Sequence, residues 1–370
     1  MNDELLKNMS ITCNHSKGTI KNYRIALKKY CAYYDMTLDE LLIEAEEDEK
    51  NNVRWKRCRL RAKLIEYRHH LIQNYAASSV IKDIGCIMFF YRFYDIEVLS
   101  LPKIAKQSLK KPQPIYFKDL PDKEIIREAF KISSPMMKAI ILFSCSSGCA
   151  MAESLGLTIH DYIDALSEYV PKRKRDIFEI IDYLNEQDDV IPTFNLRRKK
   201  TNKYYTTYCS PEAVNAINAY LLSRIDSLTN ESPLFNVSRT HLIRLFEGIN
   251  DTLGLGKVGK YNRFRSHMLR KFHASALYND GMSIDKVNDL QGKSKNITDS
   301  VYFMTNPEDL KYEYIKHLPA ITINQDVEKL SIKSPEYMRM ERENMEYKQK
   351  MDKLAADMAR IMERLPDEAK

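Results

Sequence analysis

The chain has 370 residues, of which 44% are hydrophobic and 29% charged, and its formal net charge is +7. This length and composition allow about two domains with buried cores. The sequence has no run of eighteen apolar residues, and its N-terminus MNDELLKNMS has no basic-then-apolar signal pattern, which argues against a membrane protein. Seven cysteines, odd in number and without a C-x-x-C pair, favour reduced thiols. We therefore expect a cytoplasmic protein in which Cys145 and Cys149 are a reduced helical pair.

Residues 1–105 are expected to form a helical domain. Ser16 and Thr19 can cap a helix, and Ser78-Ser79 precede a second, very apolar segment. The first of these helices carries one apolar stripe: Ile20, Tyr23, Leu27, Tyr30 and Tyr34. Residues 106–116 follow as a basic interdomain linker, because prolines interrupt helices and stiffen an extended chain.

Residues 117–325 are expected to form a second domain, mainly α with a small β-sheet. A helix begins near Pro121, and an apolar helix over MMKAIILFSCSSG ends at Gly148, before another that begins near Ala152. The segment VIPTFNLRRKKTNKYYTTYCS, residues 190–210, predicts one or two strands with a basic turn. Ser210-Pro211-Glu212 begins a further helix, and helices continue to about residue 305.

Residues 326–370 are expected to form a long C-terminal helix with a heptad pattern. Eight of its nine a and d positions are apolar or aromatic, and the exception is Asn344, a residue type that can fix register and oligomer state. The nine are Tyr337, Met340, Asn344, Tyr347, Met351, Leu354, Met358, Ile361 and Leu365. The alternative to a coiled coil is a terminal amphipathic helix that packs on its own domain.

Basic residues concentrate in three segments: residues 101–118, 197–203 and 255–273. Separate basic clusters in otherwise mixed sequence indicate a polyanion bound at several places, although any one cluster could be an ordinary solvated face. The candidate DNA-binding residues are Lys103, Lys106, Lys110, Lys111, Arg197, Arg198, Lys199, Lys203, Arg263, Arg265 and Lys271.

The segment from His267 to Phe303 has the most informative spacing in the chain. His267 and Arg270 are three residues apart, which places them on one face of a helix. Gly292-Lys293 follows, and Tyr302 lies nine residues beyond Lys293.

This segment resembles the C-terminal half of the tyrosine recombinase (phage integrase) family, which has His-x-x-Arg, then Gly-His or a variant, then a nucleophilic tyrosine at these spacings. Upstream, GCAMAESLGL resembles the family's TG-x-R-x-x-E-L-x-x-L box, with Ala150 where the first catalytic arginine belongs. RRKKTNKYYTTYCSPEAV resembles the hairpin that supplies the family's lysine, for which Lys200 is the best fit and Lys203 and Lys199 are alternatives. The resemblance covers residues 117–305, and the N-terminal domain fits the family's DNA-clamping domain only by pattern and position.

The resemblance implies that Tyr302 attacks a DNA phosphate and forms a 3′-phosphotyrosine, from which rejoining needs no ATP. Arg270, with His267 beside it, would hold the phosphate, and Lys293 would stabilise the transition state in place of the usual histidine. Lys200 would be the general acid for the leaving 5′-oxygen. With alanine at position 150 we expect very poor cleavage. We favour an introduced Arg→Ala substitution at this position over a natural variant.

The function implied is that of a site-specific recombinase or integrase whose two domains clamp double-stranded DNA. Four protomers would assemble on two DNA sites and exchange strands through a Holliday junction, with no metal, nucleotide or other cofactor. The tail and the LQGKSKNITDSVYF box look more like archaeal integrases than bacterial Xer proteins. The alternatives are a telomere resolvase or type IB topoisomerase, a DNA-binding architectural protein with no cleaving activity, and a coiled-coil scaffold that does not bind DNA.

Overall fold

The computed structural model describes residues 3–105, 114–171, 176–185, 187, 189–198, 202–224, 226, 228–293, 306–324 and 351. The chain divides into two compact units, Met1–Pro114 and Ile115–Lys370. Helices dominate both units, and the strands within the described ranges form two small antiparallel sheets, both in the second unit. The predicted fold class, mainly α with a small β-sheet, is confirmed. No helix in the described ranges is both long and apolar enough to cross a membrane.

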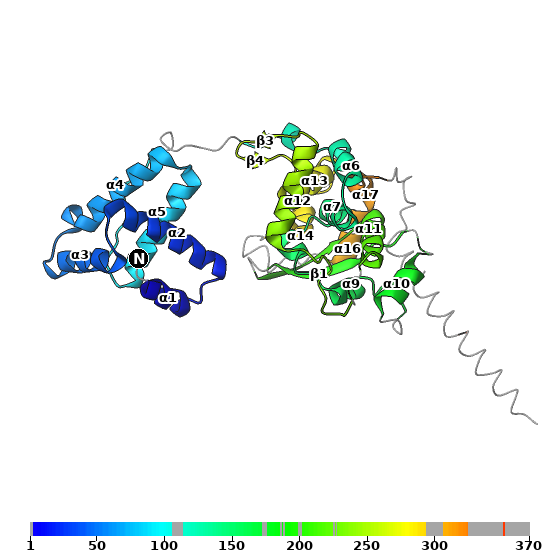
Figure 1. The fold of residues 1–370 in the computed structure, drawn as a ribbon, viewed down its shortest axis with the longest axis horizontal. Helices are drawn as coiled ribbons and strands as arrows, with labels where there is room; N and C mark the ends of the chain where they lie inside the picture. The colour runs from blue at the N-terminus through cyan, green and yellow to red at the C-terminus, as the bar shows by residue number, and fades with distance from the viewer. Residues whose placement is uncertain are drawn as a thin grey trace, which may run out of the picture. The chain divides into compact units, whose positions relative to one another are not determined.

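The first unit consists of helices around one core of aromatic and aliphatic side chains (Figure 1). Its helices are α1 (Asp3–Thr12), α2 (Lys17–Tyr34), α3 (Leu38–Lys50), the 3-10 turn η1 (Trp55–Arg57), α4 (Arg59–Asn74) and α5 (Ala77–Phe93). The predicted cap of α2 is present, since the Ser16 side chain accepts a hydrogen bond from the Thr19 amide. Helix α5 begins at Ala77, so Ser78 and Ser79 lie inside its first turn and not before it. Lys106, Lys110 and Lys111 of the expected linker lie outside the described residues.

The second unit holds the remaining elements. They are η3 (Phe117–Asp119), α6 (Lys123–Lys131), α7 (Pro135–Ser147), α8 (Met151–Ser154), α9 (Ile159–Ala165), α10 (Ile177–Leu184), β1 (Thr193–Arg198), β2 (Lys203–Tyr208), α11 (Pro211–Leu222), α12 (Arg239–Thr252), β3 (Lys257–Val258), β4 (Tyr261–Asn262), α13 (Ser266–Asn279), α14 (Ile284–Leu290), α16 (Pro307–Lys316) and α17 (Leu318–Ile321). Helix α7 contacts α6, α11, α13 and α17, and lies among them in Figure 1.

Helix α7 is central because almost every residue in its last three turns is buried. Its ends follow the sequence signals: the Ser134 side chain accepts from the Met137 amide, Pro135 occupies the first turn, and Gly148 ends the helix in the left-handed conformation (φ 62°). The chain then turns directly into α8, which begins at Met151, one residue before the expected start. This tight turn keeps the Gly148 carbonyl against Arg270 of α13.

Strands β1 and β2 form the predicted hairpin, with Thr193 opposite Tyr208 and Arg198 opposite Lys203. A second, shorter hairpin pairs β3 with β4 around Gly259, and sequence reasoning missed it. Its four strand residues are too few to show an alternating apolar pattern. The heptad positions of the expected C-terminal helix lie outside the described residues, apart from an exposed Met351.

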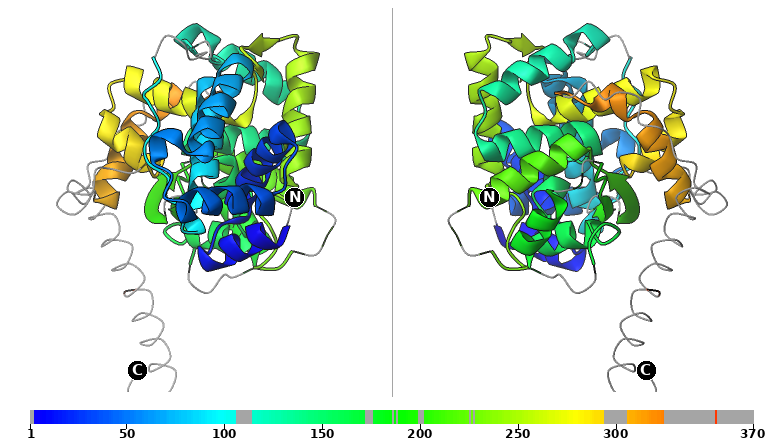
Figure 2. Two further views of the ribbon diagram at one scale, coloured as in Figure 1. Left: turned by 90° about the vertical axis from the view of Figure 1, so that its left-hand side faces the viewer. Right: turned by 90° about the vertical axis from the view of Figure 1, so that its right-hand side faces the viewer.

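A smaller core of the second unit joins β2 to the helices α13, α14, α16 and α17. Helices α13, α14, α16 and α17 pack around Tyr208 and Tyr314, and the yellow and orange helices lie side by side in both views of Figure 2. The Tyr314 hydroxyl donates to the Ser146 carbonyl (3.1 Å) near the end of α7. The Glu212 carboxylate accepts the amides of Ile323 (2.8 Å) and Asn324 (2.9 Å). This core therefore holds α14 and the turn after it against α7 and β2.

Candidate active site

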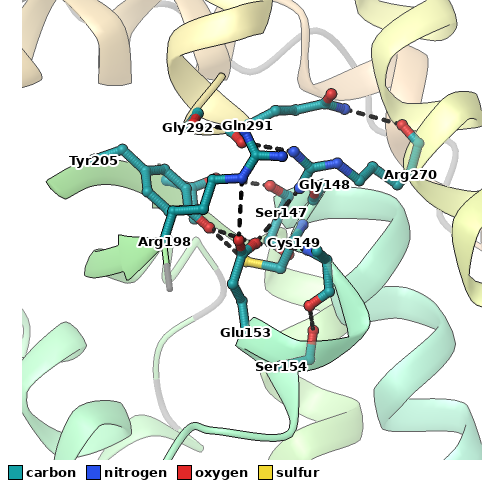
Figure 3. A network of polar contacts seen from close by, with 12 residues as sticks. Ser147, Gly148, Cys149, Glu153, Ser154, Arg198, Tyr205, Arg270, Gln291 and Gly292 are labelled. Carbon is teal, nitrogen blue, oxygen red and sulfur yellow. Dashed lines mark hydrogen bonds and ion pairs between the residues drawn. The ribbon is translucent and has the colours of Figure 1, made fainter. Parts of the chain in front are cut away.

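Four parts of the second unit converge at one polar cluster: the turn between α7 and α8, helix α13, the turn after α14, and the hairpin β1–β2. Figure 3 shows Arg270 and Arg198 approaching this cluster from opposite sides, with Glu153 between them. The surrounding cores bring together residues that are more than a hundred positions apart in sequence.

Arg270 lies in the middle of α13 and is 8% exposed. Its guanidinium donates to the carbonyl of Gly148 (2.5 Å) and to that of Gln291 (2.6 Å), which fixes its plane. Burial lowers the pKa of Arg270, and the Glu153 carboxylate acts in the opposite direction. An arginine side chain stays protonated in proteins, so the site holds a fixed, buried positive charge with further N–H groups for an anion.

Gln291 contacts both Arg270 and His273, two residues of α13. The Gln291 side chain donates to the Arg270 carbonyl (2.9 Å), and its nitrogen lies 3.2 Å from His273 Nδ1. His273 is fully buried, and burial, with Arg270 and Lys293 as nearby cations, lowers its pKa to about 3. His273 is therefore neutral at physiological pH and is a packing residue. A Cβ at Gly148 would lie 2.5 Å from His273 Nδ1, so the end of α7 can approach His273 this closely only with glycine at position 148.

Glu153 is the anion at the centre of the cluster. One of its oxygens accepts the Ala150 amide (2.8 Å) and the Tyr205 hydroxyl (2.9 Å). The same carboxylate lies 3.5 Å from Arg270 and 3.6 Å from Arg198. Burial raises the pKa of Tyr205 well above its usual value, so its hydroxyl remains a donor. One carboxylate thus holds the two arginines near each other.

The hairpin contributes Arg198 and Lys203, which face each other across β1 and β2. Arg198 donates to the Gly292 carbonyl (2.9 Å). Lys203 donates to the Lys293 carbonyl (3.1 Å), and its ammonium lies 3.8 Å from Asp289. Both side chains therefore bind the turn that carries Lys293. This close approach needs glycine at 292, where φ is +58° and a Cβ would lie 2.6 Å from the Tyr205 ring.

Lys293 and His267 complete the cationic surroundings. Desolvation, followed by the charges of Arg270 and Arg198, lowers the pKa of Lys293. Desolvation, followed by Lys271, Arg265 and Arg270, lowers the pKa of His267, whose side chain is exposed one helical turn before Arg270. Both pKa values are lowered because desolvation disfavours the charged form and the neighbouring cations add to this effect.

The structure places three of the candidate site residues, Arg270, Lys293 and Ala150, around the Glu153 cluster. Two further candidates, Tyr302 and Lys200, lie outside the described residues, and so does Lys199. The other basic candidates within the described ranges lie on or near the hairpin, the β3–β4 region, α13 and the end of the first unit: Arg197, Arg198, Lys203, Arg263, Arg265, Lys271 and Lys103. Arg263 donates to the carbonyls of Lys118 and Leu120, so its guanidinium also braces the start of the second unit.

Sequence reasoning did not assign three residues of this cluster: Glu153, Tyr205 and Gln291. The acid of the TG-x-R-x-x-E box was the one available signal for Glu153. Nothing in the local sequence distinguishes Tyr205 or Gln291 from core residues. Among the residues that the structure describes, no group of three or more His, Cys, Asp and Glu side chains could hold a metal ion.

Residues 124–308, half of the chain, match the phage integrase family. The chain therefore belongs to the phage integrase family, whose members are tyrosine recombinases, and the resemblance seen in the sequence motifs is confirmed. No curated protein matches the sequence of the chain.

Solved structures of tyrosine recombinases resemble the chain at low sequence identity. XerH site-specific recombinase, bound to palindromic difH substrate in a post-cleavage complex, is 16% identical with a TM-score of 0.53, over 84% of this chain and 82% of that one. XerA recombinase is 21% identical over 86% and 99% of the two chains, with a TM-score of 0.35. A lambda integrase(75-356) dimer bound to a COC′ core site is 12% identical over 82% and 98%, with a TM-score of 0.49. The XerH comparison shows that the fold is shared.

Proposed function

We propose that this chain is a site-specific DNA recombinase, or integrase, that cleaves and rejoins duplex DNA through a 3′-phosphotyrosine at Tyr302. One observation carries the proposal: a buried Arg270 guanidinium, fixed by two backbone carbonyls, lies next to Arg198 and Lys293 with one carboxylate between the two arginines. Such preorganised charge suits the transition state of phosphoryl transfer, where negative charge increases on the non-bridging oxygens.

In this mechanism the Tyr302 oxygen attacks a backbone phosphorus as the bond from phosphorus to the 5′-oxygen breaks. Lys200 gives a proton to the leaving 5′-oxygen, and the reverse attack by a 5′-hydroxyl restores the strand. Arg270 holds two phosphate oxygens, with His267 beside it. Lys293 adds a point charge where the family has a histidine. Ala150 adds nothing, so cleavage is slower than in a chain with arginine there, by on the order of 100–1000-fold for one preorganised donor.

The DNA partner follows from the family and from the cationic site. The XerH structure with the shared fold is bound to a difH DNA substrate. We propose that the present chain binds duplex target sites in the same way, and that four protomers assemble on two sites to exchange strands. Tyr302 and Lys200 have the roles of nucleophile and general acid that the resemblance implies.

Covalent trapping on a nicked suicide duplex tests this function. A target site is first selected from random duplexes, and adduct formation is then measured for the chain and for its Ala150→Arg variant, each with and without Tyr302→Phe. A DNA–protein adduct that Tyr302→Phe abolishes is the expected result. Comparison of the two chains then gives the cost of alanine at position 150.

The second candidate function is a DNA-binding architectural protein derived from the recombinase fold. Ala150 favours it, because an alanine stands where the family has its first catalytic arginine. Tight binding to the selected duplex with no adduct in either chain would support this function and contradict cleavage by Tyr302.

A further inference from the structure

We propose that Arg198, from the end of β1, supplies the second guanidinium of the active site in place of the arginine that is missing at position 150. The inference rests on the proposed strand-cleaving function and deepens it. It assigns a transition-state contact to a residue that the sequence placed only among the general DNA-binding candidates.

The first step of the argument is the position of Ala150. Its amide donates to the Glu153 carboxylate at 2.8 Å, so a long side chain at position 150 would begin directly beside that carboxylate. The alanine side chain has no group that could pair with this carboxylate. Arg198 fills this role from the hairpin, with its Nε 3.6 Å from the other oxygen of Glu153.

The second step is the pairing of Arg198 with Arg270. Arg270 donates to the carbonyl of Gln291, and Arg198 donates to the next carbonyl along the chain, that of Gly292. Both guanidinium groups therefore bind carbonyls of the same turn and lie near the same carboxylate, and Figure 3 shows them beside each other. The two guanidinium groups also repel each other, since the charge of Arg198 adds to the desolvation that lowers the pKa of Arg270.

The third step is the charge of the cluster. Arg198, Arg270 and Lys293 are three cations near the single carboxylate of Glu153, since Lys203 has Asp289 as its nearby acid. Holding like charges together in a partly buried site costs free energy, and an anion between them recovers it. Two planar guanidinium groups match the non-bridging oxygens of a phosphate.

The neighbouring Arg197 provides a matched comparison on the same strand. Side chains alternate along a strand, so Arg197 points to the other face. It is exposed, donates to Asn202 Oδ1 (2.6 Å) and lies over the Tyr204 ring, 5.5 Å from the centroid. Arg197 has the same charge and nearly the same position in the chain as Arg198, but its recorded partners lie away from the Glu153 cluster.

The test is a double-mutant cycle on the rate of adduct formation, measured with saturating protein on the nicked duplex. Arg198→Ala, Arg198→Lys and Arg197→Ala are each made with Ala150 retained and with Ala150→Arg. With Ala150 retained, Arg198→Ala is expected to lower the rate on the order of 100-fold. Arg198→Lys is expected to lower it as well, because an ammonium cannot fork onto two oxygens. Arg197→Ala removes a DNA-binding cation but no contact to Glu153, so with saturating protein it is expected to cost much less rate than Arg198→Ala.

The rescue arm separates a transition-state contact from a structural role. Ala150→Arg is expected to restore most of the rate lost in Arg198→Ala, because a guanidinium again reaches the same carboxylate and phosphate. An equal loss in both backgrounds would mean that Arg198 merely holds Glu153 and the hairpin, and would overturn the inference. Thermal unfolding of each variant identifies any loss of rate that comes from misfolding. If Arg198→Ala misfolds, the test relies on Arg198→Lys, which keeps a cation at this position.

Failure of the inference is distinguishable from failure of the proposed function. If Arg198→Ala cleaves as well as Arg197→Ala, or if only chains with Ala150→Arg cleave, Arg198 has no such role, while adducts that depend on Tyr302 leave the function intact. If no variant forms an adduct despite tight binding, the proposed function and the inference are both overturned.

Discussion

Lys293 is a cation of the site whose pKa is lowered by its surroundings. Desolvation and the two arginines lower its pKa below the usual 10.5, so the ammonium loses its proton at a lower pH than an exposed lysine does. If its charge stabilises the transition state, the rate of adduct formation is expected to fall as pH rises through the lowered pKa. Lys293→Arg keeps the charge and is expected to move this alkaline decline to higher pH, where the loss of the proton of Lys200 would limit the rate.

The measurement is a pH–rate profile of single-turnover cleavage for the parent and for Lys293→Arg, with Lys286→Arg as the control. Lys286 lies on the preceding helix, where it pairs with Glu313 (3.1 Å) on α16. Identical alkaline limbs in the parent and Lys293→Arg would show that Lys293 does not supply the charge.

Gly148 connects the stability of the second unit to the geometry of its site. Gly148→Ala places a Cβ 2.5 Å from His273 and forces a residue with a side chain into φ +62°. The left-handed conformation alone costs roughly 1–2 kcal/mol, and the displaced histidine adds to this. We expect a lower free energy of unfolding and slower cleavage, since the Gly148 carbonyl holds Arg270.

Gly248→Ala is the matched control, because Gly248 lies within α12 and a Cβ there would meet nothing within 4 Å. This change is expected to raise the free energy of unfolding by roughly 0.5–1 kcal/mol through the higher helix propensity of alanine. Urea denaturation of both variants measures the difference. Equal effects of the two substitutions would contradict the close contact at Gly148.

At the scale of elements, Tyr205 joins β2 to α8. Its hydroxyl donates to Glu153 and lies 3.7 Å from the Cys149 sulfur, while its ring packs under Gly292. Tyr205→Phe keeps the ring and removes the donor, so we expect a loss of about 1 kcal/mol in the free energy of unfolding. We also expect slower cleavage, because Glu153 positions both arginines.

Tyr204→Phe tests whether this effect belongs to the contact. Tyr204 is the neighbouring residue of β2, and its side chain is 72% exposed. Removal of its hydroxyl is expected to change neither the free energy of unfolding nor the cleavage rate. If both variants behave alike, the hydrogen bond from Tyr205 to Glu153 contributes neither to stability nor to cleavage.

The elements that could be predicted from sequence are those with local signals. Ser134, Pro135 and Gly148 mark the ends of α7, and Ser210-Pro211 marks the start of α11. The hairpin β1–β2 could be predicted from the strand-like segment 190–210 and its basic turn. The β3–β4 hairpin is too short for a pattern. Spacing within α13 and the turn after α14 was enough to find Arg270 and Lys293, whereas the contacts of Glu153 with Tyr205 and Arg198 arise from tertiary packing that no local pattern encodes.

At the scale of the whole molecule, each unit has its own hydrophobic core, and the second unit has a main core and a smaller one. The site lies where the hairpin and the turn after α14 meet α7, α8 and α13, so it depends on both cores of the second unit. Substitutions in either core are therefore expected to reach the site through Arg270, which contacts carbonyls at the end of α7 and after α14.

The basic surface predicts how DNA binding responds to salt. Each phosphate neutralised by a lysine or arginine releases counterions, so the logarithm of the binding constant falls with the logarithm of salt concentration by about 0.9 per contact. Arg197, exposed on the hairpin, is expected to make one such contact, and Arg197→Ala is then expected to make the slope shallower by about 0.9. Lys131→Ala is the control, because Lys131 pairs with Glu128 (2.7 Å) on α6, outside the basic clusters. Filter binding to the selected duplex over a salt series measures the three slopes.

A steep slope in the parent that only Arg197→Ala reduces would place phosphate at the hairpin, the same element that brings Arg198 to the site. A flat slope in the parent would instead support a protein scaffold, because a chain that does not neutralise phosphates has no counterions to release.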